Sequence, residues 1–294
     1  MNGLFLVDKP AGMTSFGVVA RIKRLSGQKC GHSGTLDPMA TGLLPVMVGR
    51  ATKLCSLLTG GQKRYIGTLR FGIETDTGDM TGKIIAEKAA AVDKAQFSAL
   101  LPAFTGTLTQ RPPIYSAIKV EGVPLYRHAR AGRAVEVPER TVTINRLKLL
   151  SFHAERAEAT LEVDCSKGTY IRTLFSDLAA AAGTCGTMTA LRRTRVGPYR
   201  IEQAVPLEEL MQQLERGEVP PALISLEQAL AGLPQYTPED FFATLLRNGC
   251  AVSIRKLKGL PSGLCAVYRR GELIGLGDQI ERDGETCFQV VTHL

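Results

Sequence analysis

The order of apolar and polar residues predicts that short strands make up much of this 294-residue chain. The expected strands cover residues 1–8, 43–48, 64–72, 140–152 and 157–165. In 64–72 the residues alternate, so Tyr65, Leu69 and Phe71 share the face that we expect to be buried. Several strands follow one another with no helix between them. We therefore predict an α+β fold with a mixed, largely antiparallel sheet.

Helices are predicted at fewer places, each from a local signal. Asp93 is a candidate N-cap with Gln96 three residues further on, so a short helix is expected to begin there. A second helix follows the turn at 166–169, with an apolar stripe from Ile171 to Leu178. In that helix Arg172 lies on the flank of the stripe, where it can reach past the core. Residues 206–232 are also expected to be helical.

A break at residues 232–238, rich in proline and glycine, divides the chain. Beyond it a helix near 238–248 and four short strands are expected. These strands cover residues 251–254, 264–269, 272–276 and 287–291. We therefore predict two domains: residues 1–232, and a small β-rich domain at 233–294.

The composition is that of an ordinary globular protein, with 44% hydrophobic and 22% charged residues. The sequence contains no run of about eighteen apolar residues, so we expect no membrane span. The first ten residues lack the basic segment of a signal peptide, which favours a cytoplasmic protein. Seven cysteines and four histidines show no metal-ligand spacing, so we expect neither a metal nor an organic cofactor.

The net charge of +8 is compatible with a polyanionic partner, and the distribution of the basic residues strengthens that interpretation. They gather in three clusters: Arg21, Lys23 and Arg24; Arg127, Arg130 and Arg133; and Arg192, Arg193, Arg195 and Arg200. A solvated helix face is the simplest explanation of any one cluster. Three clusters together favour contacts with a phosphate backbone.

The most informative segment is 31–49, a glycine-rich polar loop that leads into the apolar run. It carries one carboxylate, Asp37. Pro38 restricts Asp37 to an extended backbone and so fixes the direction of its side chain. An isolated Asp-Pro most often caps a turn. The length of the whole segment favours a functional carboxylate instead.

This segment closely resembles the catalytic loop of the bacterial tRNA pseudouridine-55 synthases, the TruB family. The shared motifs are Gly-His-x-Gly-x-Leu-Asp and Ala-Thr-Gly-Leu-Leu-Pro. Further matches run in the family's order from about residue 3 to 200. They include Lys9-Pro10 with the residues that follow, Lys63-Arg64-Tyr65, Ser166-Lys167-Gly168-Thr169-Tyr170-Ile171-Arg172 and Leu191-Arg192-Arg193-Thr194.

The resemblance implies a role for each matching residue. Asp37 would be the nucleophile, Arg172 its partner, and Tyr65 the residue that stacks on the target base. His32 would occupy the space that the flipped nucleotide leaves. Pocket-edge or RNA-contacting residues would be Lys9, Tyr170, Leu191, Arg192 and Arg193, and Arg130 would lie in an insertion that grips the tRNA arm. Taken singly, Tyr65 and Leu191 are equally typical of a core, and Arg172 of a helix surface.

The chemistry explains this combination. Isomerising uridine to pseudouridine breaks an N–C glycosidic bond, turns the base and forms a C–C bond, with no redox step. One nucleophilic carboxylate can carry the reaction, and a neighbouring guanidinium is expected to orient it and lower its pKa. Attack on the sugar and attack on the uracil ring both remain open from the sequence.

The resemblance therefore predicts a stand-alone enzyme that modifies uridine 55 in the T-loop of tRNA. It would bind the T-arm as a monomer without a protein partner, and residues 233–294 would be a PUA-like RNA-binding domain. Three alternatives stay open: a guide-RNA-dependent relative of the archaeal and eukaryotic type, a non-catalytic RNA-binding protein, and an additional role in RNA folding. The continuation at 40–46 favours the bacterial type over the first of these.

Overall fold

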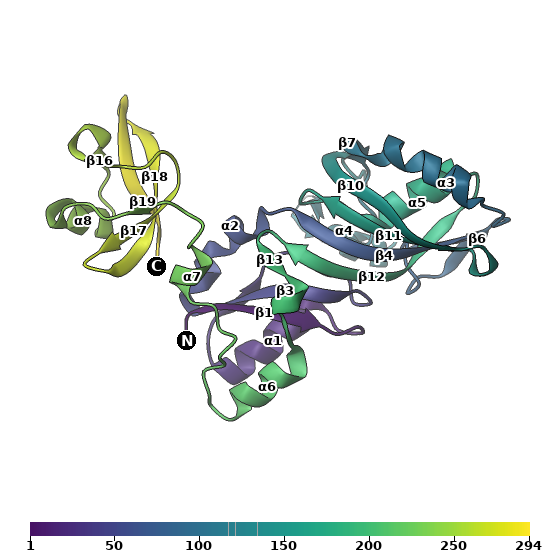
Figure 1. Cartoon of the computed structure of the whole chain (residues 1–294), viewed down its shortest axis with the longest axis horizontal. Coiled ribbons are helices and arrows are strands. Elements are labelled where there is room, and N and C mark those ends of the chain that lie inside the picture. The colour runs from purple at the N-terminus through teal and green to yellow at the C-terminus, as the bar shows by residue number, and fades with distance from the viewer. Residues whose placement is uncertain (117, 121, 134) are drawn as a thin grey trace.

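The structure is a computed structural model of the chain. It describes residues 1–294 except Ala117, Glu121 and Ala134, and except the side chains of Leu58, Thr59, Tyr126 and Arg130. The described residues form a large sheet flanked by helices, and a small β-rich domain lies at one end of the molecule (Figure 1). The predicted α+β fold class is confirmed.

Ten strands of the described chain form the large sheet, and most neighbours in it are antiparallel. In spatial order they are β14 (Val205–Pro206), β1 (Gly3–Lys9), β3 (Thr41–Val48), β12 (Gly186–Val196), β4 (Lys63–Phe71), β11 (Glu158–Cys165), β10 (Arg140–His153) and β7 (Gly106–Gln110), with β2 (Cys30–His32) beside β3 and β13 (Tyr199–Arg200) beside β12. Only the pairs β1–β14 and β3–β12 are parallel among these described strands. The parallel pairing of β3 with β12 lies at the start of β3, where the loop that carries Asp37 enters the middle of the sheet.

The remaining elements lie around this sheet or in the C-terminal domain. The helices are α1 (Ser15–Ser26), α2 (Cys55–Thr59), α3 (Lys94–Leu100), α4 (Leu125–Arg130), α5 (Ile171–Ala181), α6 (Leu207–Glu215), α7 (Leu226–Ala229) and α8 (Asp240–Arg247). Two small hairpins are β5 (Ile73–Thr75) with β6 (Ile84–Glu87), and β8 (Lys119–Val120) with β9 (Val123–Pro124). The C-terminal sheet has the order β15 (Gln235–Tyr236), β17 (Cys265–Arg269), β18 (Glu272–Arg282), β19 (Glu285–His293) and β16 (Val252–Ser253).

The apolar sides of α1, α3, α5 and α6 pack on one face of the large sheet and form its main core. Along β4 every second residue is buried on this face, which confirms the predicted alternation and places Tyr65 inside. Helix α5 lies close to the sheet because Gly67 leaves room for Phe175, whose ring would meet any added Cβ at 2.9 Å.

The predicted helix starting after Asp93 is present, and the Asp93 carboxylate accepts hydrogen bonds from the backbone of Ala95 and Gln96. The segment predicted to be helical at 206–232 instead holds two short helices, α6 and α7. Gly217, at φ 72°, ends the first helix, and two prolines follow at 220 and 221. In the described part of the chain, no helix combines the length and apolar character that crossing a membrane requires.

A second apolar core joins the C-terminal domain to the opposite face of β1 and β3. Its members from the sheet include Leu4, Leu6, Leu43 and Met47, and those from the C-terminal domain are Ala266, Leu273 and Leu276. Strand β3 is thus buried on both faces, since Leu44 and Val46 belong to the main core. The two domains share apolar contacts along the strand that leaves the loop of Asp37.

Because of this shared core, we expect one cooperative unfolding transition for the whole chain, observable by calorimetry. Leu276→Ala should lower the free energy of unfolding by about 2–5 kcal/mol, as is usual for a buried leucine. The same substitution at the exposed Leu150 is a matched control and should change it by less than about 0.5 kcal/mol. Two separate transitions, with only one of them sensitive to Leu276→Ala, would contradict a shared core.

Candidate active site

The loop that carries Asp37 is tied on one side to the first residue of α1 and on the other to the connection between β1 and α1. Before Asp37, the Ser15 hydroxyl accepts a hydrogen bond from Leu36 N at 2.8 Å and donates one to Leu36 O at 3.1 Å. After Asp37, the carbonyl of Pro38 accepts a hydrogen bond from Gly12 N at 2.8 Å. The backbone on either side of the carboxylate is therefore fixed before any substrate binds.

Lys9 holds the same loop from inside. It is fully buried, and its Nζ donates to the carbonyls of Pro10, Met13 and Pro38 at 2.8, 2.7 and 3.2 Å. Burial lowers the pKa of Lys9 to about 8, against the opposing charge of Asp37. The sequence placed Lys9 at the pocket edge or on the RNA. The structure directs its ammonium group to backbone carbonyls instead.

Arg193 has a similar place on the other side of the loop. It is fully buried on β12, where its Nε donates to Leu43 O at 2.8 Å and its Nη2 to Gly34 O at 3.0 Å. The backbone of Arg193 lies so close to Gly42 that a Cβ at residue 42 would collide with it. Only glycine fits there, and its φ of 102° also favours glycine. Arg193 thus braces the loop from within, and its guanidinium is not at the surface in this conformation.

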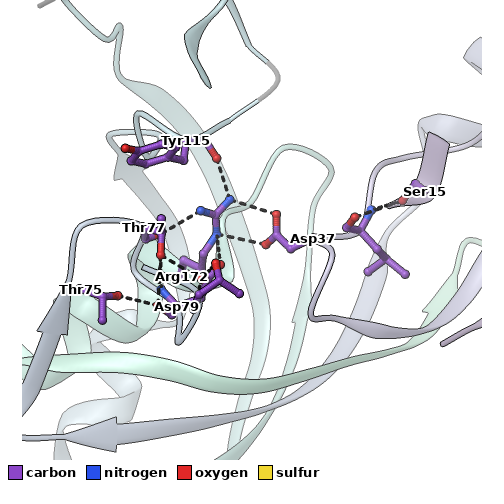
Figure 2. Close-up of polar contacts among 9 residues, drawn as sticks. Ser15, Asp37, Thr75, Thr77, Asp79, Tyr115 and Arg172 are labelled. Atoms are coloured by element: carbon purple, nitrogen blue, oxygen red, sulfur yellow. Dashed lines mark hydrogen bonds and ion pairs between the residues drawn. The ribbon is translucent and has the colours of Figure 1, made fainter. Parts of the chain in front are cut away.

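The centre of the site is a two-point contact between Arg172 and Asp37 (Figure 2). The Nη2 and Nε atoms of Arg172 each lie 3.1 Å from a different oxygen of the carboxylate. Two backbone carbonyls hold the guanidinium further, Thr77 O at 2.8 Å from Nη1 and Tyr115 O at 3.1 Å from Nη2. Paired contacts of this kind fix orientation as well as charge. The structure thus brings together the two residues that the sequence proposed as partners.

The Asp37 carboxylate lies at the edge of the buried region, since 29% of its side chain is exposed against 6% for Arg172. Burial raises the pKa of Asp37, and the charge of Asp79 acts in the same direction, while the Arg172 guanidinium and Lys9 lower it. The net direction is upward. The Arg172 guanidinium lowers the pKa of Asp37 as expected, but the opposing effect of burial is larger.

Asp79 is a member of the site that the sequence analysis missed. It lies in the polar turn between β5 and β6, yet it is buried, with Oδ2 at 4.0 Å from Arg172 Nε (Figure 2). Its Oδ1 accepts hydrogen bonds from Thr77 Oγ1, Thr81 N and Thr81 Oγ1 at 2.9, 3.0 and 2.6 Å. Arg172 therefore lies between two carboxylates, those of Asp37 and Asp79.

This arrangement predicts the effect of Asp79→Asn on the pH dependence of catalysis. The amide can still accept the bond from Thr81 N, but the negative charge that raises the pKa of Asp37 is gone. The pKa of Asp37 should fall, so activity should be lost at a lower pH than in the wild type when the protein is acidified. Single-turnover rates across pH test this, and Asp76→Asn in the same loop is the control. An unchanged acid limb would contradict a charge interaction between Asp79 and Asp37.

Tyr65 and His32 border the same loop. Tyr65 is 7% exposed; burial raises the pKa of its hydroxyl, on which the charges of Arg193 and Asp37 also act. Its side chain is therefore a core residue whose polar end faces the site. His32 is half-buried in β2, and burial lowers its pKa, so the imidazole is neutral at neutral pH.

The other predicted residues lie around this centre at different depths. Tyr170 is half-buried directly before α5, and burial raises the pKa of its hydroxyl. Leu191 is buried in the main core, beside Gly67. Arg192 is partly exposed and makes a two-point ion pair with Asp8, at 3.1 and 2.7 Å. The side chain of Arg130 lies outside the described residues.

Four cations are buried around this one loop: Lys9, Lys63, Arg172 and Arg193. Basic side chains are seldom buried so fully, and here they surround a small number of carboxylates. The resulting positive potential suits a site that receives part of a polyanion. Within the described residues, no cluster of three or more histidine, cysteine or acidic side chains could hold a metal ion.

Solved structures share this fold. One is titled as a crystal structure of a Cbf5-Nop10-Gar1 complex and matches 95% of this chain and 78% of its own, with 27% identity and a TM-score of 0.71. Another is titled as the structure of an H/ACA RNP bound to a substrate RNA containing 2'-deoxyuridine. It matches 99% of this chain and 84% of its own, with 24% identity and a TM-score of 0.71, so the two proteins share a fold. The fold, together with the pseudouridylate synthase family models that match residues 22–231, places this protein among the pseudouridine synthases.

Sequence comparison then gives the family. Residues 22–171 match the TruB family pseudouridylate synthase N-terminal domain, and residues 172–231 match the tRNA pseudouridylate synthase B C-terminal domain. The protein called tRNA pseudouridine synthase B from Aromatoleum aromaticum is 43% identical over 95% of this chain and 89% of its own length. Its namesake from Geobacillus thermodenitrificans is 42% identical over 86% of each. The chain belongs to the TruB family and is an isomerase that forms pseudouridine.

Proposed function

We propose that this protein converts uridine 55 in the T-loop of tRNA to pseudouridine, with Asp37 as the nucleophile. The observation that carries the proposal is the two-point contact of Asp37 with Arg172, in a loop fixed on both sides. The relatives named tRNA pseudouridine synthase B support tRNA as the substrate. The position within tRNA follows from the sequence resemblance in residues 31–49.

In the proposed reaction the target base leaves its stack, which costs a few kcal/mol. Its place beside Asp37 is bordered by Tyr65, whose ring is buried in this structure and would turn toward the base before its stacking offset about 1–3 kcal/mol of that cost. The ionised Asp37 attacks, the bond from N1 of uracil to the sugar breaks, and the base turns. A bond from C5 to the sugar then forms, the bond that Asp37 made breaks and restores the free carboxylate, C5 loses its proton and N1 gains one. Attack on the sugar and attack on the ring require the same ionised carboxylate.

Arg172 has two functions in this scheme. It orients both oxygens of Asp37, and its charge opposes the effect of burial on the pKa of that carboxyl. Lys9 and Arg193 hold the loop rather than the RNA. Their bonds to backbone carbonyls keep Asp37 in a fixed place while the substrate enters.

The RNA contacts are proposed for exposed basic residues of α1 and of the C-terminal domain. On α1 the side chains of Arg21, Lys23 and Arg24 are exposed. In the C-terminal domain, with the proposed boundaries 233–294, Arg255, Lys256 and Lys258 are exposed on one short segment. We propose that these groups neutralise phosphates of the T-arm, which makes binding strongly dependent on salt.

The experiment that tests the function is the mapping of pseudouridine in unmodified tRNA after incubation with the purified protein alone. We expect a single modified position, uridine 55, with no metal, cofactor, guide RNA or protein partner added. Modification only in the presence of a guide RNA would favour the guide-dependent alternative. Binding of tRNA without any modification would favour a non-catalytic RNA-binding protein, and modification elsewhere in tRNA would overturn the assignment of position 55.

A further inference from the structure

The segment from residue 110 to 116 crosses the N-terminus of α5 and contacts it at several points. Gln110, the last residue of β7, contacts the backbone of Tyr170. Further along, Arg111 O accepts a hydrogen bond from Thr173 Oγ1 at 3.4 Å, and Tyr115 O accepts one from Arg172 at 3.1 Å. This one segment therefore contacts three residues at the start of α5, namely Tyr170, Arg172 and Thr173.

Gln110 makes the most specific of these contacts. Its side chain is buried, with 3% of the residue exposed. The amide oxygen accepts a hydrogen bond from Tyr170 N at 3.0 Å, and the amide nitrogen donates one to Tyr170 O at 3.3 Å. Both polar ends of one side chain thus bind the backbone of one residue, which restricts rotation as well as translation of that peptide.

Tyr170 is the N-cap residue of α5, and its own side chain makes no capping hydrogen bond. Its carbonyl also accepts the first hydrogen bond of the helix, from Leu174 N at 3.0 Å. The amide of Gln110 therefore satisfies a backbone N–H at a helix start, where such groups lack partners inside the helix. It also joins the first turn of α5 to the end of β7.

Arg172 lies in that first turn, two residues after Tyr170. We infer that Gln110 is a positioning residue for catalysis: it fixes the start of α5 and so sets the two-point contact of Arg172 with Asp37. It touches neither carboxylate. Its effect on the reaction passes through the backbone of Tyr170, and this inference rests on the proposed role of Asp37.

The test is Gln110→Met, which keeps the length of the side chain and removes both hydrogen bonds. The single-turnover rate at saturating enzyme should fall roughly ten- to hundred-fold, because small displacements of catalytic groups are costly. The dissociation constant for tRNA should stay unchanged, since Gln110 is buried. The acid limb of the pH profile should move to higher pH, because Arg172 would oppose the burial of Asp37 less well, with Asp79 and Lys9 unchanged.

A matched control is Gln289→Met in the C-terminal domain. It removes a side-chain bond to the backbone, from Gln289 Nε2 to Gly249 O at 2.7 Å, far from the loop of Asp37. Its rate and pH profile should equal those of the wild type. Rates of both variants are compared at equal folded fraction, measured by circular dichroism.

If Gln110→Met does not fold, Gln110→Leu replaces it, because leucine also removes both hydrogen bonds to Tyr170 and adds no charge near Asp37. A folded variant of either kind that reacts at the wild-type rate would overturn the inference. So would a loss confined to tRNA affinity. If Asp37→Asn retains turnover, the proposed function itself fails, whereas an inactive Asp37→Asn with a fully active Gln110→Met removes only the role of Gln110.

Discussion

Replacing Asp37 with asparagine should abolish pseudouridine formation and leave tRNA binding intact. The amide has nearly the shape of the carboxylate and can still accept a hydrogen bond from Arg172 Nη2. It has no negative charge and cannot act as the nucleophile. Because the loop is held through its backbone by Ser15, Gly12 and Lys9, its conformation should survive the substitution.

The measurement is the single-turnover yield of pseudouridine with enzyme in excess, together with the dissociation constant for the same tRNA. Loss of a negative charge beside RNA phosphates should tighten binding slightly. Asp177→Asn, which alters an exposed aspartate on α5, is the control and should react normally. Turnover by Asp37→Asn, after mass spectrometry has ruled out deamidation back to aspartate, would falsify the assignment of the nucleophile.

Arg172→Ala should have the second largest effect, lowering the rate on the order of a hundred-fold or more at neutral pH. Asp37 would lose both contacts that orient it, and two carboxylates, those of Asp37 and Asp79, would face each other without the guanidinium between them. Arg172→Lys should retain more of the wild-type rate than Arg172→Ala but not all of it, because an ammonium group cannot contact both oxygens of Asp37 in the same planar arrangement.

The pH dependence gives this prediction a definite sign. The pKa of Asp37 is already raised by burial, and Arg172 acts to lower it. Since the ionised carboxylate is the reactive form, activity is lost as the pH falls through the pKa of Asp37 in the folded protein. Removing Arg172 raises that pKa further, so the loss should begin at a higher pH. Raising the pH should restore the charge of Asp37 and part of the rate, but not its orientation.

A suitable control is Arg270→Ala in the C-terminal domain, where Arg270 makes a two-point ion pair with Asp240, from Nε to Oδ1 at 3.2 Å and from Nη2 to Oδ2 at 2.6 Å. This pair is exposed, so its loss should leave both rate and pH profile unchanged. An acid limb that stays in place in Arg172→Ala would show that the guanidinium does not act on the ionisation of Asp37.

Much of this site could be predicted from the sequence because its central residues lie in extended motifs. The glycine-rich loop with its proline pointed to Asp37, and the resemblance to the TruB family gave Arg172 as its partner, while the apolar stripe showed only that Arg172 can reach past the core. The contact between them, which the motifs implied, is present in the structure. Strand β4 could also be predicted, since alternation is a local property of the chain.

The buried cations could not be predicted in the same way. Lysine and arginine are rare in protein interiors, and the sequence offered no reason to place Lys9 and Arg193 there. Their partners are backbone carbonyls, which take up the required positions only when the loop is folded. Asp79 was missed for a related reason. Its significance depends on Arg172, 93 residues further along the chain, and on a loop whose path has no sequence signature.

The pKa of Asp37 shows the limit of reasoning from one neighbour. The sequence suggested a guanidinium beside the acid and hence a lowered pKa. In the structure that interaction exists, yet burial and the second carboxylate act against it and prevail. The net direction required knowledge of how deeply the loop lies in the fold.

The apolar contacts of β3 restrict how this protein can be recombined with its relatives. Leu43 and Met47 pack against the C-terminal domain. Leu44 and Val46 lie on the opposite face of β3, in the main core with α1, α5 and α6. A chimaera that receives the C-terminal domain of another family member would place foreign side chains against the strand next to Asp37. Such an exchange should succeed only where the residues at 43 and 47 are inherited together with the incoming domain.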